Sequence, residues 1–250
     1  MHINFYELSL LLIFSFAVLV FILLFYISAP YGKFLRKGWG ASTTADLAWL
    51  IMELPSPALM IYFFLSASHK NIVHYIFILS WLAHYFYRTF LYPFLQAGKN
   101  KPYPLIIVFM AFVFNCINGF INGYGVFHLY SYDTGWVFSW QFITGIAIFI
   151  AGFLINKIAD SKLMHLRKES PDEYVIPRGW LFNYISSPHY MGEIIEWCGW
   201  ALMTFSLPGL AFAVFTFANL FPRAIASHKW YKKQFSNYPS ERKAIIPFII

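Results

Sequence analysis

The feature that most constrains this chain is an uncharged apolar stretch near its N-terminus. Residues 8–28 read LSLLLIFSFAVLVFILLFYIS, without a charged side chain. An α-helix needs about 20 such residues to cross a hydrocarbon core of ~30 Å. A cleaved signal peptide fits less well, because no Lys or Arg precedes the stretch and no A-x-A-like site follows it. The stretch therefore predicts a transmembrane helix.

Further apolar stretches cover residues 46–67, 72–95, 105–126, 134–157 and 190–222. The last is interrupted at Ser206-Leu207-Pro208, so the stretches amount to six or seven spans. Only 12% of the residues are charged, roughly half the ~25% of a soluble domain. The pattern predicts an all-α polytopic integral membrane protein in which residues 1–250 form a single domain.

The positions of the basic residues decide the number of spans. Sixteen of the eighteen Lys and Arg residues lie in alternate connections or in the tail, namely Lys33, Arg36, Lys37, Lys99, Lys101, Lys157, Lys162, Arg167, Lys168, Arg178, Arg223, Lys229, Lys232, Lys233, Arg242 and Lys243. Lys and Arg collect in cytoplasmic loops. These cations share one side only if residues 190–222 cross twice or form a re-entrant hairpin. We expect seven transmembrane helices, with the N-terminus outside and the C-terminus in the cytoplasm.

This distribution also explains the formal charge of +7, so we expect no nucleic-acid partner. The two cysteines, Cys116 and Cys198, lie in apolar stretches without a CxxC motif or a Cys/His cluster. We therefore expect neither a disulfide framework nor a metal site. The membrane would be that of the endoplasmic reticulum in a eukaryote, or the inner membrane in a bacterium.

Ionisable side chains within spans mark candidate functional sites, because each costs a few kcal/mol at membrane depth. Glu53 lies in mid-span beside Pro55, which should weaken the local helix. Glu193 and Glu196 are one turn apart on one helical face, either in the protein interior or at the membrane interface.

Asn115, Asn118 and Asn122 form a polar stripe along one predicted span. The stripe fits a ligand site and helix-to-helix hydrogen bonding equally well.

Polar residues on the cytoplasmic side are typical of a site for an anionic ligand. Asn156 and Asp160 are spaced i, i+4, and Arg167 follows two turns later. The segment Ser186-Ser187-Pro188-His189 has the Ser and Pro that open a helix. A helix start beside several cations suits a pyrophosphate. GxGxxG and GxxxxGK[ST] motifs are absent from the sequence, which excludes Rossmann-type and P-loop binding.

The chain resembles the steroid 5α-reductase family over nearly its whole length. The segments that carry the resemblance are Glu53-Leu54-Pro55-Ser56, His84-Tyr85-Phe86, Arg88-Thr89-Phe90, Lys101-Pro102-Tyr103-Pro104, Asn156 with Asp160, Leu166-Arg167-Lys168, Tyr174 to Pro177, Gly192 to Trp197, and Arg242 to Phe248. The resemblance implies a seven-helix membrane enzyme that transfers hydride from NADPH to the conjugated C4=C5 bond of a 3-oxo-Δ4 steroid. Its hydrophobic substrate would enter from the bilayer.

The resemblance also assigns roles to individual residues. Glu53 and Tyr85 would bind the C3 carbonyl of the steroid. The cofactor pocket would comprise Lys33, Lys101, Asn118, Asn156, Asp160, Arg167, Tyr174, His189, Glu193, Arg223 and Tyr231. Three positions depart from the family's steroid enzymes, since Met52 replaces Gln, His189 replaces Asn and Ser227 replaces His. The run Ser-Ser-Pro-His-Tyr is closer to that of the polyprenol reductases, so another enone or enoyl lipid remains an alternative substrate.

The assigned pair suits the chemistry. An enone accepts hydride only if the charge developing on its carbonyl oxygen is stabilised, and a Tyr hydroxyl with a neutral carboxylic acid can do this. A rival class is the isoprenylcysteine-type methyltransferases, which use S-adenosylmethionine; methyl transfer to a thiolate needs no such acid. A seven-helix receptor or light-driven pump is a further alternative, but the last predicted span has no Lys for a retinal Schiff base.

Overall fold

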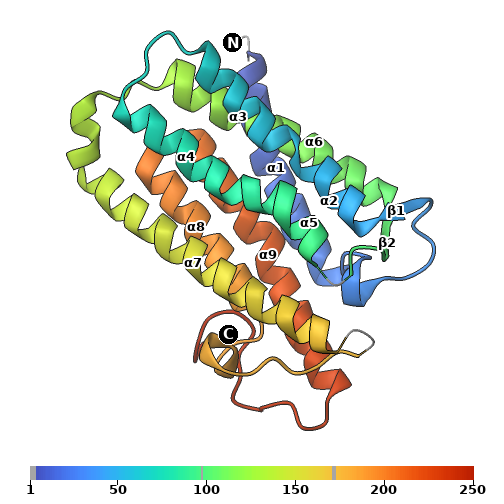
Figure 1. Cartoon of the computed structure of the whole chain (residues 1–250). Helices are drawn as coiled ribbons and strands as arrows, with labels where there is room; N and C mark the ends of the chain where they lie inside the picture. Colours follow the sequence, from blue (N-terminus) through green and yellow to red (C-terminus); the bar gives the residue numbers. More distant parts are fainter. Residues whose placement is uncertain (1–3, 97, 171–172) are drawn as a thin grey trace.

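The computed structural model describes residues 4–96, 98–170 and 173–250, most of them in helices that form one bundle (Figure 1). The helices are α1 (Phe5–Tyr26), α2 (Ala45–Glu53), α3 (Pro55–Ser66), α4 (Ile72–Phe86), α5 (Tyr92–Leu95), α6 (Leu105–Tyr124), α7 (Trp140–Glu169), α8 (Pro188–Thr204) and α9 (Leu207–Gln234). The strands are β1 (Ser42–Thr44) and β2 (Pro102–Pro104). The prediction of a helical membrane-type chain is confirmed.

Within the described residues, five helical segments are long and apolar enough to cross a membrane: α1, α2 with α3, α6 with the turn after it, α7 and α9. Helix α4 has 15 residues and α8 has 17. A π-helical turn over Tyr87–Leu91 joins α4 to α5. The long apolar stretch is divided where Ser206 and Pro208 predicted, because Ser206 Oγ accepts a hydrogen bond from Gly209 N at 3.2 Å and caps α9.

The fifth predicted span differs from the structure at both ends. A 3₁₀ turn over Thr134–Phe138 precedes α7, and Ser139 Oγ caps the helix by accepting a hydrogen bond from Phe142 N at 3.2 Å. At its other end α7 continues to Glu169, well past the apolar stretch. Hydropathy does not detect this extension, because it is polar and lies beyond the apolar residues that define a span.

A break in the second span lies beside Glu53. Helix α2 ends at Glu53 and α3 begins at Pro55, whose ring nitrogen has no hydrogen to donate to the helix. Asn115 of α6 donates a hydrogen bond from Nδ2 to the backbone oxygen of Met52, in the last turn of α2, at 2.7 Å. An amide of the polar stripe thus supplies a hydrogen-bond donor to a backbone oxygen at the kink. For Asn115, of the two roles expected from the sequence, the structure shows helix-to-helix hydrogen bonding.

Helices α7 and α8 pack with their backbones in contact. Gly145 and Gly152 on α7 face Gly192 and Gly199 on α8, and a Cβ added to any of the four would overlap backbone atoms of the facing helix. Small residues allow such close approach between membrane helices. The contact fixes the polar end of α7 beside the first turns of α8.

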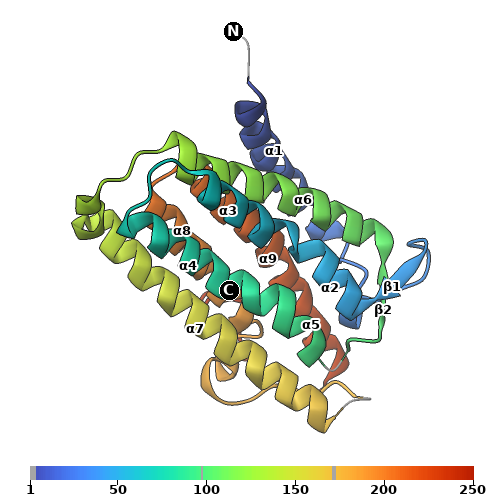
Figure 2. The ribbon, with the colours of Figure 1, turned by 45° about the horizontal axis from the view of Figure 1, so that its top comes forward.

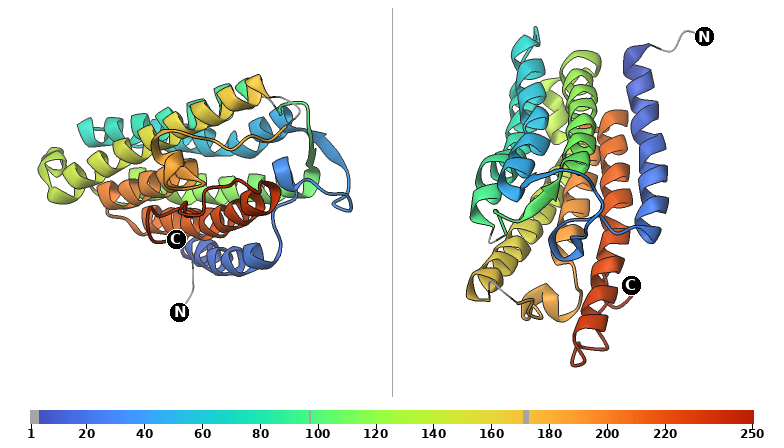
Figure 3. Two further views of the ribbon diagram at one scale, coloured as in Figure 1. Left: turned by 90° about the horizontal axis from the view of Figure 1, so that it is seen from below. Right: turned by 90° about the vertical axis from the view of Figure 1, so that its right-hand side faces the viewer.

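The connections that carry most cations gather at one end of the bundle (Figure 2). There β1 pairs antiparallel with β2, and Thr43 opposes Tyr103. Figure 3 shows α1 at the edge of the bundle beside α9. The loop that follows α1 reaches α9, where Lys33 contacts Ser227 and Tyr231.

Candidate active site

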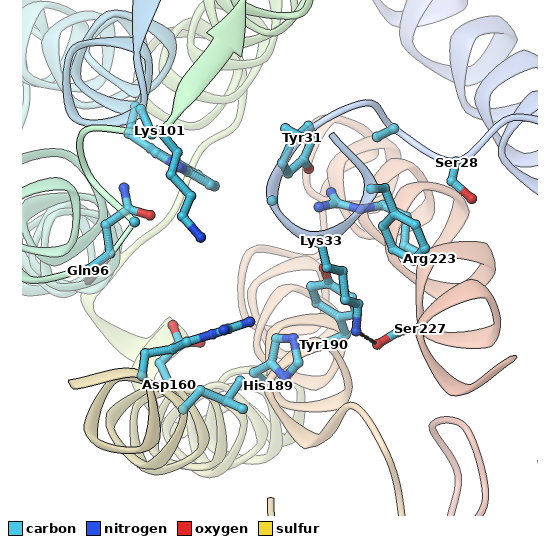
Figure 4. Close-up of a pocket in the computed structure, with 18 of the residues that line it drawn as sticks. Ser28, Tyr31, Lys33, Gln96, Lys101, Asp160, His189, Tyr190, Arg223 and Ser227 are labelled. Atoms are coloured by element: carbon cyan, nitrogen blue, oxygen red, sulfur yellow. Dashed lines mark hydrogen bonds between the residues drawn. The ribbon is translucent and has the colours of Figure 1, made fainter. Parts of the chain in front are cut away.

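A cavity of about 300 Å³ lies at this end of the bundle, among the loop after α1, the α5–β2 connection and helices α7, α8 and α9 (Figure 4). Nine of the eleven predicted cofactor residues line it: Lys33, Lys101, Asp160, Arg167, Tyr174, His189, Glu193, Arg223 and Tyr231. They come from six separate parts of the chain, the sixth being the α7–α8 connection that carries Tyr174. The structure therefore brings together most of a set that the sequence shows only as scattered positions.

The other two predicted cofactor residues do not line the cavity. Asn156 is buried at its edge, where Nδ2 donates to the backbone oxygen of His189 at 3.0 Å and to Glu193 Oε2 at 3.4 Å. Asn118 lies deeper, and its Oδ1 accepts a hydrogen bond from Asn122 at 3.0 Å. Asn122 Oδ1 in turn accepts from Trp200 Nε1 at 2.9 Å. Asn115 and Asn122, two of the three amides in the polar stripe, thus form hydrogen bonds between α6 and other helices.

One wall of the cavity carries Lys33. Its ammonium donates a hydrogen bond to Ser227 Oγ (Figure 4). It also lies 4.3 Å from the ring centre of Tyr231 and 4.9 Å from that of Trp230. Burial and, to a smaller extent, the positive charge of Arg167 together lower the pKa of Lys33 to about 7. Lys33 can therefore bind an anion as a cation, but it changes charge near neutral pH.

The next part of the wall combines cations with aromatic rings. The guanidinium of Arg167 stacks 3.3 Å from the ring centre of Tyr174, which packs against Trp230 with ring centres 4.9 Å apart. Arg223 lies between the rings of Tyr31 and Tyr190, at 5.0 and 5.2 Å from their centres. Such a wall can stack a planar base and pair with phosphate oxygens.

The tyrosines near Arg223 stay protonated. The rings of Tyr31 and Tyr103 stack with centres 4.7 Å apart, joining the loop after α1 to β2. Burial raises the pKa of both hydroxyl groups, although Arg223 acts in the opposite direction. Both groups remain hydrogen-bond donors across the physiological pH range.

The first turn of α8 forms the floor of the cavity. Pro188 is its first residue, as the sequence predicted, but Ser187 Oγ makes no capping hydrogen bond. Among the described residues, Ser187 Oγ and His189 Nδ1 are buried without hydrogen-bond partners. A helix N-terminus with unpaired polar groups and nearby Lys33 and Arg223 fits the pyrophosphate of a dinucleotide.

Sequence reasoning missed the central role of Arg88. Its guanidinium lies 3.9 Å from Glu53 Oε1, 3.8 Å from Asp160 Oδ2 and 3.7 Å from Glu193 Oε2, and it also stacks 4.5 Å from the ring centre of Trp49. Arg88 thus joins three helices around the cavity. The sequence did contain an indication, because Arg88 is a cation within an apolar stretch. A charged side chain at membrane depth is costly and is therefore usually paired with an opposite charge.

Pro93 provides a local reason for the position of Arg88. Its nitrogen cannot donate to the carbonyl of Thr89, and the chain widens there into the π-helical turn. Arg88 and Tyr92 then both face the cavity. π-helical turns of this kind occur often at functional sites.

The two predicted substrate residues lie beyond the cavity lining. Glu53 reaches the cavity through Arg88, and Tyr85 lies one turn before Arg88 on α4. The Tyr85 ring is buried against Trp81 and Trp197, with centres 5.1 and 5.9 Å away. Arg88 therefore separates the polar cavity from an aromatic, apolar region of the bundle.

Comparisons with known proteins add to this geometry. The chain matches the family described as 3-oxo-5-alpha-steroid 4-dehydrogenase over residues 101–250. Steroid 5-alpha-reductase DET2 of Arabidopsis thaliana is 44% identical over 237 residues, which cover 91% of this chain and 90% of the relative. 3-oxo-5-alpha-steroid 4-dehydrogenase 1 of Bos taurus is 40% identical over 238 residues, which cover 93% of this chain and 92% of the relative. The similarity extends well beyond the cavity to most of the bundle.

Proposed function

Because the chain belongs to the 3-oxo-5-alpha-steroid 4-dehydrogenase family, we propose that it reduces the C4=C5 bond of a 3-oxo-Δ4 steroid with NADPH. The resemblance seen in the sequence is confirmed, and the chain is an oxidoreductase of the type that acts on a CH–CH group. The observation that carries the proposal is identity of 40–44% over nine-tenths of the chain, together with a cationic cavity beside an aromatic interior.

The residues present fit NADPH. Lys33, Arg167 and Arg223 offer positive charge to its phosphates, the start of α8 offers backbone N–H groups, and Tyr174 offers a ring for stacking. When bound, the cofactor supplies the hydride, whereas the protein supplies binding, orientation and exclusion of water. Asp160 and Glu193, held by Arg88, would contact the part of the cofactor nearest the substrate.

The cofactor assignment has its own test. Loss of a charge-assisted hydrogen bond to phosphate costs about 1.5–3 kcal/mol, so Arg167→Ala should raise the KM for NADPH by about 10- to 100-fold. The KM for NADH, which has no 2′-phosphate, and the KM for the steroid should change much less. An equal rise in all three would remove Arg167 from the cofactor site.

Glu53 and Tyr85 would act on the substrate. Hydride adds to C5 only as negative charge builds on the C3 oxygen, and hydrogen bonds from the Tyr85 hydroxyl and a protonated Glu53 would stabilise that charge. The buried rings of Trp81 and Trp197 beside Tyr85 provide an apolar, water-poor surface. A steroid could reach this region from the bilayer.

The decisive experiment incubates purified protein with a 3-oxo-Δ4 steroid and NADPH and follows the product by mass. We expect a gain of two hydrogens, with deuterium from 4-deuterated NADPH retained in the product. A polyprenyl substrate serves as a parallel arm, because His189 belongs to the segment that resembles the polyprenol reductases. Turnover of the polyprenyl substrate alone would overturn the steroid assignment.

We further propose seven membrane crossings, with the N-terminus outside and the C-terminus in the cytoplasm. Support comes from Lys33, Lys101, Arg167 and Arg223, which follow different spans and yet line one cavity. A tag at the C-terminus should be shielded from an impermeant probe in intact cells. Labelling of that tag would reverse the orientation.

A further inference from the structure

A buried hydrogen bond between α4 and α8 has no place in the chemistry proposed above. His84 Nδ1 lies 2.9 Å from Glu196 Oε1, and the two side chains are 3% and 0% exposed. The other carboxylate oxygen, Oε2, is buried without a hydrogen-bond partner among the described residues. Two ionisable groups are thus enclosed in the interior and bonded to each other.

This bond lies directly against the tyrosine assigned to the substrate. Tyr85 follows His84 on α4, and their ring centres are 5.1 Å apart. Trp197 follows Glu196 on α8, and its ring centre lies 4.7 Å from that of His84 and 5.9 Å from that of Tyr85. Consecutive residues of α4 therefore pack against consecutive residues of α8, so a shift of the bond would move the Tyr85 ring.

A second connection lies one helical turn nearer the cavity. Arg88, four residues after His84, approaches Glu193, three residues before Glu196, to 3.7 Å. The two helices run in opposite directions (Figure 1), so the two connections form successive rungs between them. Glu193 lines the cavity. The two contacts therefore fix Tyr85 on α4 relative to Glu193 on α8.

Stability alone gives little reason for such a bond. An enclosed ionisable pair must recover the cost of leaving water, and well-packed apolar side chains of similar volume often stabilise a protein as well or better. Its distinctive property is geometric, because a hydrogen bond fixes donor and acceptor within a few tenths of an ångström.

We propose that His84 and Glu196 are positioning residues, whose hydrogen bond sets the distance between the substrate oxygen held at Tyr85 and the cofactor held beside Glu193. The proposal rests on the function proposed above. Neither side chain needs to touch the reacting atoms. A misplacement of about 1 Å can reduce a rate by roughly 100-fold without weakening binding, so the effect should be on kcat and not on KM.

The test compares four variants in the full chain. His84→Phe keeps a ring, Glu196→Met keeps the side-chain length, and each removes the hydrogen bond; the double variant removes both partners. We expect each single change to lower kcat by about 10- to 100-fold with both KM values changed less than about threefold. The double variant should be no worse than the poorer single variant. Glu196→Gln keeps an acceptor oxygen and should retain most of the parent kcat.

Tyr132→Phe is the matched control. It removes another buried hydrogen bond to α8, from the Tyr132 hydroxyl to the backbone oxygen of Thr204 at 2.6 Å, at the end of the helix away from the cavity. This variant should melt at a lower temperature and keep its kcat. If His84→Phe and Glu196→Met behave in the same way, the pair is structural and the positioning role is overturned.

The activity of the parent enzyme distinguishes failure of the proposed function from failure of the positioning role. If it does not reduce a 3-oxo-Δ4 steroid with NADPH, the proposed function fails and the positioning role fails with it. If the parent is active while the variants keep its kcat, or if Glu196→Gln loses as much rate as Glu196→Met, only the positioning role is overturned.

Discussion

The Nε atom of Arg88 and the Oε1 atom of Glu53 lie 3.9 Å apart. A helix kink places the carboxyl group there, and a π-helical turn places the guanidinium. Their side chains are only 13% and 14% exposed. This pair stands where the cationic cavity meets the residues proposed to bind the substrate.

Arg88→Met should therefore destabilise the fold. It would leave Asp160 and Glu193 without the cation that they share, and removing one partner of a buried ion pair costs about 3–5 kcal/mol. Arg88→Lys should lie between this variant and the parent, because an ammonium cannot contact three acidic side chains at once as a planar guanidinium does. Unfolding of the detergent-solubilised protein measures the change. Arg36→Met, at an exposed site, is the control, and equal stability of the two Met variants would contradict the role of Arg88.

Tyr85→Phe and Glu53→Gln test the substrate pair. Removing one donor from a developing oxyanion typically costs about 3–4 kcal/mol, so kcat should fall by roughly 10²- to 10³-fold in Tyr85→Phe. The double variant should be little worse than the poorer single variant, because both groups act on one atom. Cofactor affinity should survive in all three. Parent rates in all three variants, with the fold unchanged, would exclude these residues from catalysis.

Glu53→Gln also separates two roles for the acid. Gln has nearly the same size and keeps an N–H donor. A mild loss of rate would mean that hydrogen bonding to the substrate oxygen suffices. A loss as large as that of Tyr85→Phe would mean that the acid must also deliver a proton.

Lys33 should make cofactor binding depend on pH. With a pKa of about 7 in the free protein, Lys33 is charged below pH 7 and neutral above it. A bound phosphate favours the charged form and raises this pKa. Affinity should therefore be full below pH 7 and decrease above it, by up to about tenfold per pH unit, until the pH exceeds the pKa of the complex.

Titration of NADPH from pH 6 to 9 checks this expectation. Lys33→Arg should flatten the profile, since arginine stays protonated throughout. Lys33→Met should bind more weakly at pH 6 and also show a flatter profile. A parent profile unchanged by both substitutions would place Lys33 outside the phosphate site.

The glycine contact between α7 and α8 predicts a large loss of stability. In Gly152→Ala the new methyl group would overlap the backbone nitrogen of Glu196, and backbone cannot move aside as a flexible side chain can. Overpacking of this kind typically costs about 1–3 kcal/mol, and sometimes more. Gly98→Ala, whose Cβ would meet only the side chain of Lys101 at 3.6 Å, should melt near the parent temperature. Similar melting of the two variants would show that the helices can separate.

The sequence predicted the features that depend on local composition. Hydropathy located the long helices, Pro55 located the kink beside Glu53, and Ser206 with Pro208 located the start of α9. The cation distribution predicted that the basic residues share one side of a membrane, and several of them line one cavity. These signals are local or concern one side of a membrane, so they can be read without knowledge of the helix packing.

Features that depend on packing were not predictable in this way. Arg88 lies within an apolar stretch, but its acidic neighbours are residues 53, 160 and 193, and spacing cannot show that these converge. Glu196 shares a helical face with Glu193, yet one bonds His84 in the interior and the other lines the cavity. The length of α7 beyond its apolar part was also missed, because hydropathy marks only the apolar residues of a span and the last turns of α7 are polar.

The order in which the acidic partners of Arg88 occur along the chain has a consequence for biosynthesis. Glu53 is made before Arg88, whereas Asp160 and Glu193 follow much later. The newly made segment from α2 to α5 can therefore enter the bilayer with the Glu53 side chain already beside the Arg88 guanidinium, which lowers the cost of burying that charge. The later helices then bring two further acids to a cation that is already inserted, so the polar centre is completed only when α8 has been integrated.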